Sequence, residues 1–310
     1  MTKLWKLLYW PIVTPILIVR SRKLSPFDYK ELCRLQFVVN PFYLGENSFY
    51  GHAHAIRRAG FRVWGARIEH AVFFSDSGVR NAVVTSWAKR FFYRLKTIYT
   101  YGEERKGCIE RCLCENNLKM RVVAVGPYIR YAQEFYAENE HVRLKKKMGR
   151  ILLVFPQHSV EGVSVRYSFE DMIAKIRDVG RDYDTVLISM YWKDILDGKA
   201  AVYEKAGFIV VSSGRREDPY FMSRQKSLIR LADRIMTNSV GTYIGYAISM
   251  GRPCYFYNGE SSFSADSRTE AVNFTELSDM KSEFAGRFSD PRAPITSNQL
   301  SFIQRYWGNW

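Results

Sequence analysis

The sequence lacks a cysteine pair of the CxxC type, although it contains 5 cysteines, an odd number. Cys108, Cys112 and Cys114 lie close together, but no histidine with metal-ligand spacing follows them. Structural zinc sites combine such cysteines with further Cys or His ligands at fixed spacing. We therefore expect free, reduced thiols and a reducing compartment, the cytoplasm.

Two further patterns fall short of a metal site. His52 and His54 are two residues apart, so they do not share one face of a helix. The segment 182–184 has the Asp-x-Asp form of a metal-binding motif, but it precedes a predicted strand and so lies at the edge of the sheet opposite the candidate site. We therefore expect no metal and no bound cofactor.

The sequence also has no apolar run long enough to cross a membrane. Residues 4–19 are mostly apolar, but a membrane-spanning helix needs about 20 such residues. Pro11 and Pro15 are expected to prevent a continuous helix. Basic residues flank the run, and the absence of a small-residue cleavage site argues against a secretory signal. We predict that residues 1–24 lie on a membrane surface, and docking on the protein core is the alternative.

Acidic residues are scarce relative to basic ones, with 31 Asp and Glu against 46 Lys and Arg, a net charge of +15. Proteins of this charge meet nucleic acid, anionic membranes or phosphorylated small molecules. The basic residues are spread along the chain, and no nucleic-acid-binding motif is present. We therefore expect an anionic membrane surface and a phosphorylated substrate as partners, and no nucleic acid.

Short β-prone segments alternate with helical patterns through most of the chain, which is typical of parallel sheets flanked by helices. A polar stretch at 131–150 interrupts the pattern and is interpreted as a linker. The predicted strands are 35–40, 62–68, 83–86, 96–99, 122–125, 151–155, 185–190, 208–211, 235–236 and 254–257. The main predicted helices of the second half are 168–179, 223–232 and 241–250.

This pattern predicts an α/β fold with two Rossmann-like domains that face each other across a cleft. The expected divisions are a membrane-surface segment 1–24, an N-terminal domain 25–140, a C-terminal domain 141–296 that carries the main candidate site, and a final helix 297–310.

The segment Asn238-Ser239-Val240-Gly241-Thr242 follows a predicted strand and opens a predicted helix. The free N–H groups of a helix N-terminus attract anions, an effect of about 0.3–1 kcal/mol. Gly241 leaves room for a ligand beside the backbone, and the hydroxyls of Ser239 and Thr242 add donors. We predict a phosphate or diphosphate site here, and an ordinary capped turn is the alternative.

Other strand ends of the same domain carry residues that suit a nucleotide, because ligands of open α/β sheets bind at the carboxyl ends of the strands. His158 follows the first strand, and its imidazole can bind a phosphate or stabilise a departing one. The further candidate ligands are Ser159 beside it, Tyr191 and Trp192 for stacking on a base, Ser213 and Gly214 for close approach to a ribose or phosphate, and Arg224 for the diphosphate charge.

The N-terminal domain offers Glu69 and His70 at the end of the predicted strand 62–68. A carboxylate beside an imidazole can act as a general base that removes a proton from a hydroxyl. A surface glutamate next to a packed histidine is the alternative. We predict that Glu69, His70 and His158 are the catalytic residues.

Several runs together resemble bacterial capsular and O-antigen biosynthesis glycosyltransferases with a GT-B fold, a likeness that spans about residues 35–260. The runs are Ile68-Glu69-His70-Ala71-Val72-Phe73-Phe74, Val125-Gly126-Pro127-Tyr128-Ile129, Val154-Phe155-Pro156-Gln157-His158-Ser159 and Asn238-Ser239-Val240-Gly241-Thr242-Tyr243-Ile244-Gly245-Tyr246. Such relatives commonly have Gly after the Glu-His pair, where this chain has Ala71. The layout is also distantly similar to bacterial sialyltransferases and glycerophosphate polymerases, which implies donor-phosphate contacts from His158 and Ser239.

The resemblance implies transfer of a sugar from a nucleotide-sugar donor, a co-substrate, to a glycan or lipid-linked acceptor in surface polysaccharide biosynthesis. It places the enzyme in the cytoplasm, peripheral at the inner face of the cell membrane. Two alternatives stay open. One is a phosphotransferase that moves a polyol phosphate from a CDP carrier, and the other is a non-catalytic basic scaffold on the membrane that binds no nucleotide.

Overall fold

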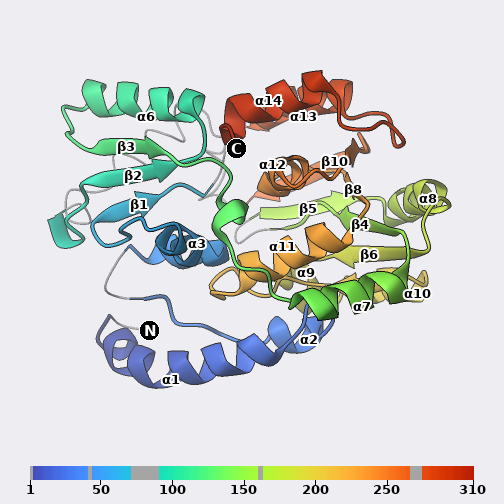
Figure 1. Ribbon diagram of the computed structural model, residues 1–310, viewed down its shortest axis with the longest axis horizontal. Helices are drawn as coiled ribbons and strands as arrows, with labels where there is room; N and C mark the ends of the chain where they lie inside the picture. Colours follow the sequence, from blue (N-terminus) through green and yellow to red (C-terminus); the bar gives the residue numbers. More distant parts are fainter. Residues whose placement is uncertain (1–2, 41–43, 71–90, 160–162, 266–273) are drawn as a thin grey trace.

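Two parallel sheets stand side by side in the computed structural model, which describes residues 3–40, 44–70, 91–159, 163–265 and 274–310 (Figure 1). The N-terminal sheet has the order β1-β2-β3, with β1 at Ala66–Ile68, β2 at Thr97–Thr100 and β3 at Arg121–Ala124. Its helical segments are η1 (Gly45–Gly51), α3 (His52–Arg58), α6 (Glu103–Glu115) and η2 (Tyr128–Tyr131). Because the strands are parallel, the residues that follow β1, including Glu69 and His70, lie at the carboxyl edge of this sheet.

The C-terminal sheet has five parallel strands in the order β7-β6-β4-β8-β9. The strands are β4 (Ile151–Phe155), β6 (Thr185–Ser189), β7 (Ile209–Val211), β8 (Arg234–Thr237) and β9 (Cys254–Phe256). Counted from β4 along the chain, this order is 3-2-1-4-5, the strand order of a Rossmann fold. All residues of β4 are buried, as expected for a central parallel strand with both faces covered. The direction of strand succession reverses between β4 and β8, and ligands of such sheets bind at that point.

Helices cover both faces of the C-terminal sheet. The buried side chains of α8 and α10 join one hydrophobic cluster, and those of α11 and α12 join another on the opposite face. The helices of this half are α7 (Glu138–Met148), α8 (Phe169–Gly180), α9 (Trp192–Leu196), α10 (Ala200–Lys205), α11 (Phe221–Leu231), α12 (Thr242–Ser249) and α13 (Phe274–Arg287). A separate antiparallel pair is formed by β5 (Val163–Tyr167) and β10 (Ser261–Ala265).

The two ends of the described chain cross between the halves. The N-terminal helices α1 (Lys3–Lys23) and α2 (Tyr29–Leu32) lead into the C-terminal half, where Ser212 N donates to Pro26 O at 3.0 Å. The last helix, α14 (Ser297–Trp307), lies beside α6 of the N-terminal half (Figure 1). Its Trp307 ring also packs against α12, where a Cβ at Gly245 would overlap the ring. Residues 24–33 therefore pack on the C-terminal half. The sequence prediction divided them between the membrane segment and the N-terminal domain.

The predicted fold class is confirmed, because the structure has two α/β units with parallel sheets. The predicted order of alternating strands and helices from Ile151 to Phe256 is also present. The predicted strand 35–40 is wrong, since this segment has no strand pairing and links α2 to the N-terminal sheet. The predicted strand 83–86 lies outside the described residues.

The structure corrects one expectation about helices and adds a helix to the predicted linker. Residues 3–23 form one helix that contains Pro11 and Pro15. These prolines are four residues apart and both exposed, so the hydrogen bonds that they omit lie on one outward face and the helix continues. The polar stretch interpreted as a linker contains α7, which has Glu138 and Glu140 in its first turn and three lysines in its last. These charges complement the helix dipole and stabilise a helix without an apolar repeat.

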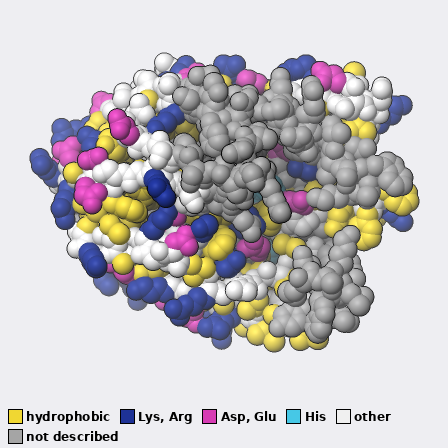
Figure 2. All heavy atoms as spheres, turned by 180° about the vertical axis from the view of Figure 1, so that it is seen from behind, with side chains coloured by type: hydrophobic (Ala, Val, Ile, Leu, Met, Phe, Trp, Pro, Cys, Tyr) yellow, Lys and Arg dark blue, Asp and Glu magenta, His cyan; other side chains and the backbone are white. Residues whose placement is uncertain are grey.

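The basic side chains are scattered over the described surface. The back of the molecule shows Lys and Arg on its left, upper and lower edges, with no single patch (Figure 2). This agrees with their even spread along the sequence.

Candidate functional site

The carboxyl ends of β4 and β8 are joined by a side chain. Gln157 N donates to Asn238 Oδ1 at 2.7 Å, and Asn238 is buried. Asn238 also lines a cavity of about 390 Å³ between the start of α8 and the β5–β10 pair. The other lining residues are Arg166, Tyr167, Ser168, Asp171, Met172, Tyr257, Gly259, Glu260, Ser261 and Ser262. The reversal point of the sheet is therefore next to a polar cavity, and sequence reasoning found only one of its lining residues as a candidate ligand.

The N-terminus of α12 is open. Gly241 is its N-cap residue, and no side chain caps this helix. Other described helices, among them α6, α7 and α11, also have no such cap, whereas Ser168 caps α8 and Thr296 caps α14 through their hydroxyl groups. Ser239, Gly241 and Thr242 are half-buried, so their outer surfaces reach solvent. The first turn of α12 therefore presents N–H groups that an anion can bind.

Aromatic rings pack against the turn that precedes α12 and support it. The Tyr243 hydroxyl donates to Ser239 O at 2.7 Å, and the Tyr243 ring stacks on Phe155 with centroids 4.5 Å apart. Ser239 N donates to the Thr237 hydroxyl at 3.0 Å. A Cβ at Gly241 would overlap the Tyr243 ring, so glycine is required there. These contacts support the turn, and the protein itself uses the N–H and C=O of Ser239.

His158 is held in one orientation and one tautomer. Its ring stacks on Tyr191 with centroids 4.3 Å apart, and its Nδ1 lies 3.2 Å from Ser159 O. A carbonyl only accepts, so Nδ1 carries the proton and the neutral ring presents the Nε2 lone pair. Burial lowers the pKa of His158, which keeps the ring neutral near pH 7.

Ser159 forms hydrogen bonds within the protein that stabilise the fold. It is buried, its N–H donates to Asp194 at 3.1 Å, and its hydroxyl accepts from Val165 N at 3.2 Å and Lys199 Nζ at 3.1 Å. These contacts correct its predicted role as a ligand of the nucleotide. They fix the loop that carries His158.

Tyr191 and Trp192, the two aromatic residues after β6, contact different partners. Tyr191 stacks on His158, and Trp192 lies under the guanidinium of Arg215 at 4.0 Å from the ring centroid. Both rings are half-buried. Tyr191 is therefore placed beside His158, whereas Arg215 covers one face of Trp192.

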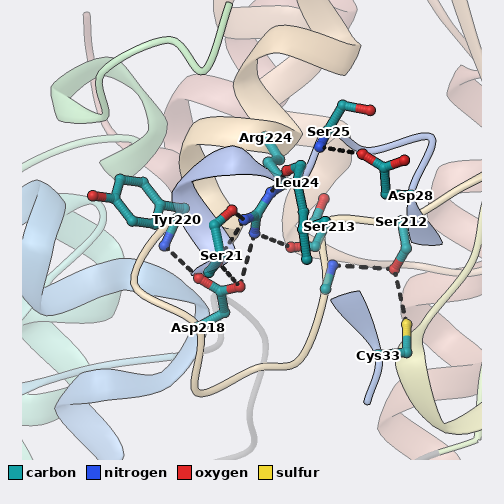
Figure 3. A network of polar contacts seen from close by, with 11 residues as sticks. Ser21, Leu24, Ser25, Asp28, Cys33, Ser212, Ser213, Asp218, Tyr220 and Arg224 are labelled. Atoms are coloured by element: carbon teal, nitrogen blue, oxygen red, sulfur yellow. Dashed lines mark hydrogen bonds and ion pairs between the residues drawn. The ribbon is translucent and has the colours of Figure 1, made fainter. Parts of the chain in front are cut away.

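The residues predicted after β7 form a structural clamp (Figure 3). Arg224 is fully buried and pairs with Asp218 at 2.9 Å, and its remaining donors reach Ser213 O, Leu24 O and both oxygens of Ser21. Gly214 N donates to Ser212 Oγ at 3.1 Å. These contacts correct the assignment of Ser213, Gly214 and Arg224 to the nucleotide site, because the clamp binds α1 instead.

Glu69 does not form the predicted base unit with His70. Its carboxylate pairs with Arg105 at 2.7 Å and with Arg67 at 3.3 Å, and the Glu69 and Arg105 side chains are 3% and 5% exposed. Both carboxylate oxygens are engaged by guanidinium groups. The structure corrects the role of Glu69 from base to partner of a buried ion pair.

His70 is paired with His52 instead. Their rings stack with centroids 5.2 Å apart, and their Nδ1 atoms lie 3.2 Å from each other. His70 Nε2 is buried and has no hydrogen-bond partner among the described residues. Burial lowers the pKa of His70 to about 4 and that of His52 well below its usual value. Both rings are therefore neutral at pH 7.

Tyr50 connects the two halves and was missed by sequence reasoning. It has φ of 57°, in the left-handed region, and its N–H donates to Arg216 O at 2.5 Å. Its ring lies 5.7 Å from His52, and its hydroxyl is close enough to Tyr191 for the two phenols to affect each other's pKa. Strained backbone at an inter-domain contact is a signal that only a structure provides. Tyr50 thus links the histidine pair to the aromatic stack on His158.

The described residues contain no group of three or more His, Cys, Asp or Glu that suits a metal ion. All 5 cysteines lie in the described parts of the chain, and each is a free thiol, as predicted. Among the helices that the structure describes, none has the length and apolar character to cross a membrane.

The chain matches no protein-family model, and no curated protein matches it in sequence. Among solved structures it is similar to Anabaena Alr3699/HepE in complex with UDP-glucose, with 13% identity over 78% of this chain and 68% of that one, at a TM-score of 0.37. It is similar to the UDP-GlcNAc 2-epimerase from Methanocaldococcus jannaschii, with 13% identity over 93% and 80% of the two chains and a TM-score of 0.37. The sucrose-phosphate synthase from Thermosynechococcus elongatus has 12% identity over 84% and 68% and a TM-score of 0.34. These values are too low to transfer an activity, so the assignment of the fold depends on the strand order of this chain.

Proposed function

We propose that this protein is a metal-independent glycosyltransferase of the GT-B type that uses a nucleotide-sugar donor. One observation carries the proposal: the uncapped N-terminus of α12 stands at the point where the strand order of a Rossmann sheet reverses. A diphosphate bound there meets the N–H groups of the first turn and the hydroxyls of Ser239 and Thr242. Asn238 is next to it and lines a cavity large enough for part of a nucleotide or sugar.

His158 supports the departure of the nucleotide in this proposal. As the acceptor hydroxyl attacks the anomeric carbon, the bond to the nucleotide diphosphate breaks and negative charge grows on the leaving oxygen. The N–H groups at the α12 N-terminus stabilise that charge in place of a metal. The negative charge of the bound diphosphate raises the pKa of His158, so that its Nε2 can take up a proton and donate it to the leaving oxygen. We expect turnover to be unchanged by EDTA, and loss of activity that Mg²⁺ restores would contradict this part.

His70 replaces the Glu69–His70 unit as the proposed acceptor-side base. Its pKa of about 4 makes a neutral imidazole but a weak proton acceptor. A bound diphosphate adds negative charge near the gap between the halves, and such charge raises the pKa of a histidine. The proposed acceptor is a glycan or lipid-linked sugar in surface polysaccharide synthesis, reached by a cytoplasmic enzyme at the anionic inner face of the cell membrane.

A thermal-shift panel of UDP, GDP, CMP and CDP tests the donor site. We expect one of them to raise the melting temperature, and the Ser239→Ala/Thr242→Ala double variant to weaken its binding. Ser249→Ala in the last turn of α12 is the control, because it is remote from the open end. No shift with any nucleotide would favour a scaffold, and release of CMP from a CDP-polyol would favour a phosphotransferase.

A further inference from the structure

Helix α1 has an inverted arrangement of polar and apolar side chains. Thr14 and Ser21 face the body of the protein and are 7% and 0% exposed. Ile12, Ile16 and Val19 face outward and are 68%, 65% and 58% exposed. Residues spaced by four and three lie on one helical face. A surface helix of a soluble protein normally places that apolar face inward, so the outward stripe needs a partner.

The clamp of Figure 3 fixes this orientation. Ser21 Oγ donates to Asp218 Oδ2 at 2.6 Å, and Arg224 donates to Ser21 O at 2.5 Å and to its Oγ at 2.6 Å. Arg224 and Asp218 pair with each other at 2.9 Å, and both are fully buried. Rotation of α1 to bury Ile12 and Ile16 would leave this buried ion pair without its hydroxyl partner. The fold therefore holds the apolar stripe away from the protein core.

The charge next to the stripe indicates the partner. The last turn of α1 contains Arg20, Arg22 and Lys23, and its first turn has no acidic residue. Arg20 pairs with Glu31, whereas Arg22 and Lys23 are exposed. Figure 1 places α1 along the lower edge of the molecule. An apolar stripe next to basic side chains fits an anionic lipid surface.

A second copy of the chain fits this surface less well. Each copy has a net charge of +15, and pairing two α1 helices would bring their basic ends close together. Among the described side chains of α1, the stripe has three aliphatic residues, which is small for a stable dimer interface. A bilayer accepts such side chains below its phosphates while Arg22 and Lys23 remain at the headgroups.

We propose that the outward face of α1, formed by Ile12, Ile16 and Val19 with Arg22 and Lys23, is the surface that docks this protein on an anionic lipid bilayer. The clamp from Ser21 to Arg224 sets the angle at which the rest of the protein meets the membrane. This inference rests on the proposed location at the membrane, but not on the proposed reaction.

Vesicle co-sedimentation of the full chain tests the proposal. We expect binding to vesicles of phosphatidylcholine with phosphatidylglycerol, and little binding to pure phosphatidylcholine. Ile12→Glu/Ile16→Glu should abolish binding, and Arg22→Glu/Lys23→Glu should weaken it at least about thirtyfold at low salt. The matched control is Leu196→Glu on α9, because Leu196 is another exposed apolar side chain, at 49%, and its variant should bind as the wild type does.

Two measurements separate this inference from the function itself. The nucleotide panel in solution should give the same result for Ile12→Glu/Ile16→Glu as for the wild type, which also shows that the variant is folded. Size-exclusion chromatography reports whether the stripe joins two copies. The proposal would be overturned if Ile12→Glu/Ile16→Glu bound vesicles as the wild type does, or if Leu196→Glu lost as much vesicle binding as that double variant. A wild-type dimer that Ile12→Glu/Ile16→Glu dissociates would also overturn it.

Discussion

His52 and His70 share a contact between their Nδ1 atoms at 3.2 Å, inside the protein and beside the inter-domain residue Tyr50. One of the two nitrogens must carry a proton, so each ring fixes the tautomer of the other. If His70 donates, its buried Nε2 presents a lone pair. The pair therefore decides whether His70 can accept a proton from a substrate.

The first prediction concerns stability in mild acid. Burial lowers the pKa of His70 to about 4 in the folded state, against an ordinary value of 6.5. The unfolded chain then binds more protons between these values, so stability is complete above pH 6.5 and falls as the pH drops toward 4. We expect a loss of about 2 kcal/mol from this group between pH 7.5 and pH 5. Denaturant unfolding at both pH values measures it.

The His70→Asn variant provides the comparison for that experiment. Its unfolding free energy should depend less on pH over the same window, because the group that binds the extra proton is gone. An unchanged pH dependence would show that His70 is not held as a neutral, buried ring.

The second prediction separates structure from catalysis at Glu69. Glu69→Gln leaves Arg105 buried without its counter-charge, which costs about 3–5 kcal/mol. We therefore expect a lower melting temperature and less folded protein, with turnover per folded molecule largely retained. Activity and circular dichroism on the same sample give both values. A stable variant with strongly reduced turnover would restore Glu69 as the base.

The third prediction concerns the clamp. Arg224→Ala should lower the free energy of unfolding by about 3–5 kcal/mol, because Asp218 then remains buried and unpaired. Arg305→Ala is the control, since the pair of Arg305 with Glu104 is largely exposed and its loss should cost less than about 1 kcal/mol. Similar losses in both variants would contradict the assignment of the clamp.

The fourth prediction tests the turn before α12. Gly241→Ala should weaken nucleotide binding, because the new Cβ displaces the Tyr243 ring that supports the turn. Gly286→Ala in α13 has open space around it, and it should be neutral or stabilise by up to about 1 kcal/mol. Calorimetric titration with the nucleotide found by the panel measures the affinities. Equal affinity in Gly241→Ala and the wild type would show that the turn does not bind the ligand.

The sequence was a good guide where the signal is local. The apolar runs of β4 and β8 and the cap at Ser168 predict their elements directly, and the parallel order then places His158 near Asn238. Roles that depend on distant partners were not accessible. Arg105 contacts Glu69 across 36 residues and Arg224 contacts Ser21 across 203, so nothing in the sequence indicates the buried contacts of these arginines. The left-handed backbone of Tyr50 has no sequence signal, since its residue type does not favour that conformation.

The crossing of the two chain ends has a consequence for synthesis. A Cβ at Gly102 would lie 2.9 Å from the backbone of both Tyr306 and Gly308, so the start of α6 packs against the end of α14 and the residue that follows it. A nascent chain therefore exposes this part of the N-terminal half until residues 297–308 have left the ribosome. The emergence of residues 297–308, rather than completion of the first sheet, is the step that covers the start of α6.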